Sequence, residues 1–100
     1  MKQLPADVTP YKRTPTFTAD SIPAGLLKAH RTKAGTWGKI IIHSGRLLYR
    51  ILEPDFEEVQ LSPERYGVVE PTMLHEVQTD GDVEFHVEFQ ALPTARWSAS

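Results

Sequence analysis

Residues 30–45 read HRTKAGTWGKIIIHSG, and this stretch decides the fold that the sequence predicts. Its tryptophan and three consecutive isoleucines predict a β-strand from Trp37 to His43, since β-branched and aromatic side chains suit a pleated surface. Lys33-Ala34-Gly35 before the strand predicts a turn, and Gly45 after it predicts a second turn or a bulge.

The rest of the chain alternates short strand-like segments with turn residues. No segment has the periodicity of a long helix, so the sequence predicts an all-β fold, an antiparallel sandwich or barrel. Asp80-Gly81 predicts the turn of a hairpin. The strand-like segments are 11–18, 25–32, 46–52, 56–61 and 83–89. Pro15 makes the first of them an edge strand or an extended arm, since proline cannot donate to a ladder. In 46–52 the period of two places Leu47, Tyr49 and Ile51 on one face.

The composition is that of an ordinary globular protein and sets limits on function. One hundred residues with a formal net charge of −2 predict a single domain over residues 1–100 and no nucleic-acid partner, which would require a basic surface. The chain has no cysteine, which excludes disulfides and thiolate metal sites. It has neither a signal peptide nor a stretch long enough to span a membrane, so a cytoplasmic location and no membrane partner are expected.

Histidine is the strongest candidate metal ligand in this sequence. His30 and His75 fall on separate predicted strands, which an antiparallel fold can bring together around a metal ion. Two half-exposed polar side chains would explain the same pattern. His43 is predicted to be a solvent-facing turn residue, and His86 an exposed cross-strand partner between two glutamates.

Three further side chains are candidates for ligand binding. Trp37 could lie over a pocket or pack in the core, and Lys33 could attract an anion or lie in a solvated turn. Glu70 could orient His75 or form an ion pair elsewhere. Phosphate-binding glycine loops and the Gly-x-Ser-x-Gly elbow are absent from the sequence, and no catalytic residue is assigned.

Four segments carry a resemblance to a known family: PYKRTPTFTADSIPAGLL (10–27), HRTKAGTWGKIIIHSGRLLYRIL (30–52), VVEPTMLHEV (68–77) and VEFHVEF (83–89). They resemble the TehB/YeaR-like domain family, a small cupin-type domain of tellurite-resistance proteins that occurs alone or ahead of a methyltransferase. The resemblance covers roughly residues 10–92 and leaves 1–9 and 93–100 as loose ends. It implies a cupin-like double-stranded β-helix, the jelly-roll barrel.

The resemblance also implies a metal site, although an incomplete one. The wider cupin pattern has a His-x-His pair and a glutamate in its first motif, and a histidine after a proline in its second. Here His30 and His75 match, whereas Thr32 and Gly38 occupy the places of two other ligands. Half of the ligand set is missing, so the resemblance implies at most one divalent ion (zinc, nickel or iron) on His30 and His75.

Three hypotheses about function follow. The first is a stand-alone binding module that holds a metal ion, a small ligand or an oxyanion in the barrel and acts in a tellurite-type stress response. The second is a metal-dependent cupin enzyme that acts on a small polar substrate. The third is an interaction domain in which the barrel is a scaffold. Cupin barrels often pair through their sheet edges, and the proline-rich N-terminal arm could cross to a partner. A homodimer is therefore expected.

Overall fold

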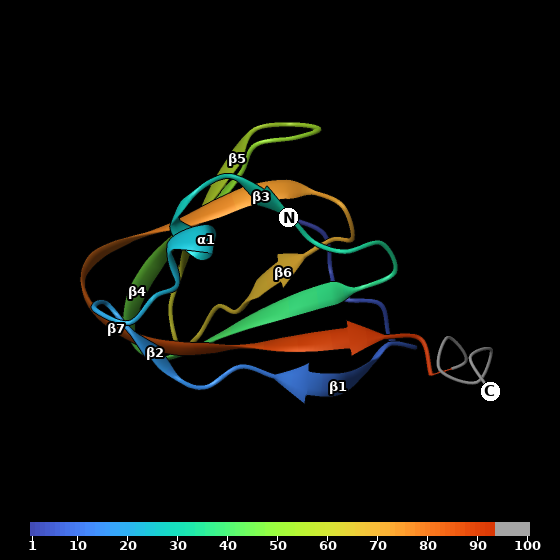
Figure 1. The fold of residues 1–100 in the computed structure, drawn as a ribbon, viewed down its shortest axis with the longest axis horizontal. Helices are drawn as coiled ribbons and strands as arrows, with labels where there is room; N and C mark the ends of the chain where they lie inside the picture. The colour runs from blue at the N-terminus through green and yellow to red at the C-terminus, as the bar shows by residue number, and fades with distance from the viewer. Residues whose placement is uncertain (94–100) are drawn as a thin grey trace.

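The computed structural model describes residues 1–93, and these residues form a β-protein with one short helix (Figure 1). The predicted all-β class is confirmed. No helix among these residues has the length and apolar character needed to cross a membrane. The elements are β1 (Thr9–Arg13), β2 (Phe17–Thr18), α1 (Ala24–Leu27), β3 (His30–Arg31), β4 (Trp37–Ile51), β5 (Glu57–Leu61), β6 (Gly67–Val69) and β7 (Leu74–Ala91).

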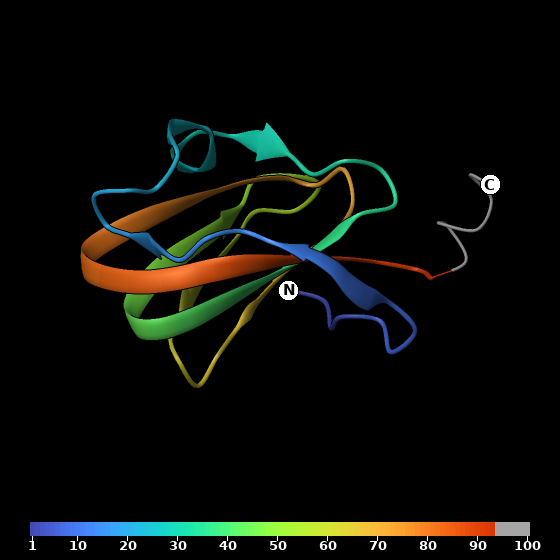
Figure 2. The ribbon, with the colours of Figure 1, turned by 60° about the horizontal axis from the view of Figure 1, so that its bottom comes forward.

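The two long strands, β4 and β7, form the centre of the fold. They pair antiparallel along their whole length, from Trp37 opposite Gln90 to Ile51 opposite His75. Both strands curve around at one side of the molecule, so that the first and second halves of each lie in different layers (Figures 1 and 2). The remaining strands pair with these two: β1, β2 and β3 with β7, and β5 and β6 with β4.

The strands described make one open antiparallel sheet. Its main path has the order β1-β7-β4-β5, and β2, β3 and β6 are attached to the long strands beside this path. Because this pairing does not close into a barrel, the cupin-like double-stranded β-helix implied by the resemblance is not confirmed. What is established is a bent sheet with a concave and a convex face.

The bend coincides with an irregular part of the β4–β7 ladder. Gly45 pairs with Val83 but Leu47 pairs with Thr79, so three residues of β7 oppose one residue of β4. Gly45 has a φ of 79°, and a Cβ at this position would overlap the carbonyl oxygen of Asp82. Glycine is therefore required here by the backbone conformation and by the close approach of the two strands.

The predicted hairpin at Asp80-Gly81 is wrong, because these residues belong to the irregular part of the continuous strand β7. Gly81 has a φ of 110°, a conformation that a bulge can use as readily as a tight turn. The predicted turn or bulge at Gly45 is confirmed as a bulge.

The hydrophobic core lies on the concave face, where alternate residues of the strands point inward. Leu47, Tyr49 and Ile51 are buried as the period of two predicts. Other members of the core are Ile22, Ile40, Ile42, Val59, Leu61, Val69, Met73, Val77, Val83, Phe85 and Val87.

Two segments differ from their sequence-based prediction. The predicted strand at 25–32 is replaced by α1 and the two-residue strand β3. The segment is short, and Pro23 stands at the N-terminal end of α1, where a residue without an N–H is tolerated because that group would have no partner in the helix. The N-terminal residues 1–9, expected to be loose, make contacts: Val8 is buried, and Met1 lies against Glu57 and Val68. Of the expected loose end at 93–100, only Pro93 lies within the described residues.

Replacing Gly45 with alanine tests the bend. We expect Gly45→Ala to lower the free energy of unfolding by at least about 2 kcal/mol, since it combines an unfavourable positive φ with steric overlap of backbone. Urea unfolding measures this change. Gly35→Ala is the matched control, because Gly35 has a φ of 78° but no atom near its would-be Cβ. Equal losses in the two variants would contradict the proposed packing at the bend.

Candidate functional site

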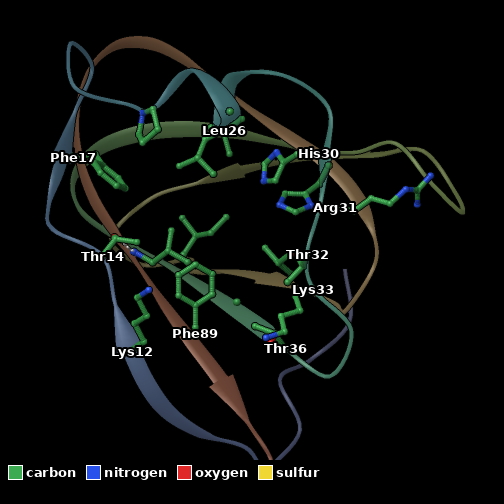
Figure 3. Close-up of a pocket in the computed structure, with 18 of the residues that line it drawn as sticks. Lys12, Thr14, Phe17, Leu26, His30, Arg31, Thr32, Lys33, Thr36 and Phe89 are labelled. Carbon is green, nitrogen blue, oxygen red and sulfur yellow. Dashed lines mark hydrogen bonds between the residues drawn. The ribbon is translucent and has the colours of Figure 1, made fainter.

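A cavity of about 700 Å³ is lined by the concave face of the sheet and by the chain that precedes β4 (Figure 3). This volume falls within the range of roughly 300–1,000 Å³ that is typical of small-molecule sites. Its wall is mainly apolar, and Figure 3 shows Phe17, Leu26 and Phe89 directed into it. Pro23, Ile40, Val69, Val77, Phe85 and Val87 also belong to the apolar lining.

Two histidines meet in the wall of this cavity. His30 on β3 is the register partner of His75 on β7, and their ring centroids are 4.1 Å apart at an interplanar angle of 57°. Both rings border the cavity. The structure therefore brings together the two histidines that the sequence singled out, although this proximity does not by itself show what they bind.

Backbone hydrogen bonds fix the tautomer of both rings. Nδ1 of His30 lies 3.0 Å from the carbonyl oxygen of Lys28, and Nδ1 of His75 lies 2.9 Å from that of Met73. A carbonyl oxygen can only accept, so each Nδ1 must carry the proton. In the neutral rings Nε2 is then an acceptor, and neither Nε2 has a hydrogen-bond partner within residues 1–93.

His75 is neutral at physiological pH. Its side chain is buried, and this desolvation lowers its pKa to about 4. The hydrogen bond to Met73 acts in the opposite direction, and the neighbouring His30 lowers the pKa further. The rings of Tyr49 and His75 also pack in a T-shaped arrangement, with centroids 5.9 Å apart. Tyr49 is anchored by a 3.0 Å hydrogen bond from its hydroxyl to the carbonyl of Val68.

Of the other predicted ligand-binding residues, Lys33 lines the cavity, whereas Trp37 and Glu70 do not. Trp37 is half-buried and lies on the opposite face of β4 from Gly38, since neighbouring strand residues alternate between faces. Glu70 borders a second depression and forms an ion pair of 3.6 Å with Lys2.

The donor set of the cavity falls short of a catalytic metal centre. Thr32 and Gly38, which stand where the cupin pattern has ligands, do line the same cavity. Neither supplies an imidazole or a carboxylate, and a Cβ at Gly38 would lie 3.2 Å from Cβ of Val69. Within residues 1–93 no group of three His, Cys, Asp or Glu side chains could hold a metal. Catalytic zinc sites use three protein ligands, and here there are two.

The second pair of histidines lies on the other face of the sheet. His86 was predicted to be exposed, and this is wrong: its exposure is 6%, and its Nδ1 lies 2.6 Å from Nε2 of His43. The His43 ring packs edge-on against it with centroids 4.8 Å apart, which helps to cover it. His43 is exposed as predicted, but it belongs to β4 rather than to a turn.

Sequence reasoning missed several residues that form the cavity. The alternation in 83–89 predicted that Phe85, Val87 and Phe89 share a face, but it gave no sign that this face borders a cavity. Lys12 and Leu26 carried no signal in the sequence, because their positions depend on how the N-terminal segment folds over the sheet.

Comparisons with known proteins agree with this architecture. A model of the TehB-like domain family matches residues 12–87. The probable S-adenosyl-L-methionine-dependent methyltransferases TehB of Haemophilus influenzae strains Rd and 10810 are each 33% identical over 76 residues, which cover 72% of this chain and 27% of theirs. The chain thus spans about a quarter of the length of these curated relatives.

Two solved structures share the fold. The crystal structure of TehB from Haemophilus influenzae has a TM-score of 0.79 and 32% identity, over 87% of this chain and 32% of that one. A structural-genomics crystal structure of a protein from Escherichia coli K12 has a TM-score of 0.82 and 20% identity, over 93% of this chain and 99% of that one. The family resemblance seen in the sequence is confirmed, and this chain belongs to the TehB-like domain family.

Proposed function

We propose that this TehB-like domain binds a small organic molecule with a mainly apolar body in the cavity between the bent sheet and the segment before β4. The observation that carries the proposal is the cavity itself, with its volume of about 700 Å³ and its wall of aliphatic and aromatic side chains. Burial of apolar surface would supply most of the binding free energy, at about 25 cal/mol per Å².

Aromatic rings form one side of the proposed site. Phe17 on β2 packs edge-to-face with Phe85 on β7, with ring centroids 5.6 Å apart and planes at 64°. This contact holds the β2 segment against the sheet, while Leu26 on α1 closes the cavity from above in the view of Figure 3. A bare inorganic oxyanion would leave this apolar wall without contacts, so the cavity favours an organic ligand.

The histidine pair provides the polar contact of the site. Because both Nδ1 protons are donated to backbone carbonyls, the two Nε2 atoms can accept hydrogen bonds from a ligand hydroxyl or N–H group. Acceptors in a largely apolar wall favour a ligand that satisfies them, since desolvating a polar atom without a partner is costly. We propose that His30 and His75 orient the ligand in this way.

The proposal assigns this chain a binding role rather than a reaction. Two relatives are named as probable methyltransferases, but the present chain matches 27% of their length. With two histidine donors and no third ligand within residues 1–93, we propose no metal-dependent step. In a tellurite-type stress response, the domain would act by sensing or holding its ligand.

Filling part of the cavity should weaken binding. N-phenyl-1-naphthylamine, a neutral apolar probe with an N–H donor, is expected to fluoresce on binding to the wild-type domain. Leu26→Trp places extra volume inside the cavity and should weaken binding at least tenfold, as measured by fluorescence titration.

Leu27→Trp is the matched control for this experiment. Leu27 is the next residue of α1, is 45% exposed and does not line the cavity, so this variant should bind like the wild type. Equal probe affinity in Leu26→Trp and the wild type would show that the probe binds elsewhere and would contradict the proposed function.

The buried neutral state of His75 predicts a dependence of stability on pH. Its pKa is about 4 in the folded protein and close to 6.5 in the unfolded chain, so between these values the unfolded state binds more protons. Stability therefore falls as pH drops from 6.5 to 4, by up to about 3 kcal/mol from this residue.

His75→Gln, which cannot titrate, should show a correspondingly weaker loss over the same pH range. Urea unfolding at a series of pH values measures both slopes. Parallel pH profiles in the wild type and the variant would contradict the burial of a neutral His75.

A further inference from the structure

We propose that the ligand is an amphipathic organic anion, such as an aryl or alkyl carboxylate, whose charged group lies between Lys12 and Lys33. This inference rests on the proposed function and adds the chemical class of the ligand. It places the apolar body against Phe17, Leu26 and Phe89 and leaves Nε2 of His30 and His75 to accept a hydrogen bond from the ligand's far end.

The charges around the cavity are of one sign. Among the described residues that line it, the charged ones are Lys12, Arg31 and Lys33, and none is an aspartate or glutamate. A concave site lined by one sign of charge, with apolar walls, concentrates the potential inside it and attracts the opposite charge. This feature is local, because the whole chain has a net charge of −2.

Arg31 is not available for this role, whereas the two lysines are. The guanidinium of Arg31 pairs with Glu53 at 2.7 Å, donates to the carbonyl of Thr72 at 3.1 Å, and points away from the cavity in Figure 3. Neither Lys12 nor Lys33 forms an ion pair with a carboxylate of residues 1–93. Both lysines are exposed residues that line the cavity, so their ammonium groups are free to meet an anionic group of the ligand.

The fold places both lysines at the same end of the cavity. The hydroxyl groups of Tyr11 and Thr36 lie 3.2 Å apart, and Tyr11 is the neighbour of Lys12 in the chain. The N–H of Thr36 donates a hydrogen bond to the carbonyl of Lys33, so the same turn carries Lys33. In Figure 3, Lys12 and Lys33 lie on the side of Phe89 and Thr36, and His30 lies on the opposite side with Leu26. One end of the cavity thus carries the two lysines and the other end carries the histidine pair.

A pair of probes that differ by one charged group tests this inference. 8-Anilinonaphthalene-1-sulfonate has the skeleton of N-phenyl-1-naphthylamine with a sulfonate added. At low ionic strength the wild-type domain should bind the sulfonate about threefold to tenfold more tightly than the neutral probe, and 0.5 M salt should remove most of this preference. The double variant Lys12→Gln/Lys33→Gln should lose the preference, which is measured as the ratio of its affinities for the two probes.

The double variant Lys28→Gln/Arg46→Gln is the matched control, since both residues are exposed, lie outside the cavity and carry the same total charge. It should keep the preference for the sulfonate. An equal loss in both double variants, or no preference in the wild type, overturns the inference. Either result leaves the proposed function in place if Leu26→Trp weakens binding of the neutral probe. If Leu26→Trp leaves the binding of both probes unchanged, the proposed function fails as well.

Discussion

The continuous pairing of β4 with β7 through a shared bend is the constraint on which the rest of the structure depends. A long antiparallel pair can fold back on itself without losing its ladder when both strands change direction at the same place, as they do between Gly45 and Asp82. The bend turns one face of the sheet into a concave interior, and the alternation of side chains along each strand fills that interior with apolar residues.

The candidate site is a direct consequence of this bend. His75 near the beginning of β7 and Phe89 near its end border the same cavity because the strand between them turns back (Figure 2). The segment before β4 then contributes the other wall, with His30 paired to β7 and Leu26 on the short helix. The histidine pair, the apolar side chains and the two lysines thereby reach different parts of one cavity, which is the arrangement that an amphipathic ligand requires.

The sequence predicted those features that local chemistry determines. The alternation of Leu47, Tyr49 and Ile51 identified a buried strand face, and the glycine at the end of the isoleucine run identified the bulge. Asp80-Gly81 misled because the same two residues suit a hairpin and a bulge, and the long-range pairing with β4 decides between them. Likewise, the positions of Lys12 and Leu26 in the cavity wall depend on tertiary packing that no local pattern encodes. The sequence singled out His30 and His75 as residues that an antiparallel fold can bring together, and the family resemblance strengthened this expectation. Their proximity is observed, whereas their role as ligands stays a prediction.

A crystal structure of the domain in complex with 8-anilinonaphthalene-1-sulfonate would locate the ligand site directly. We expect the aromatic rings of the probe to lie between Leu26 and Phe89, with the sulfonate at the end formed by Lys12 and Lys33. A structure in which the probe lies on the convex face of the sheet while the cavity beside His75 is empty or collapsed would contradict the central claim.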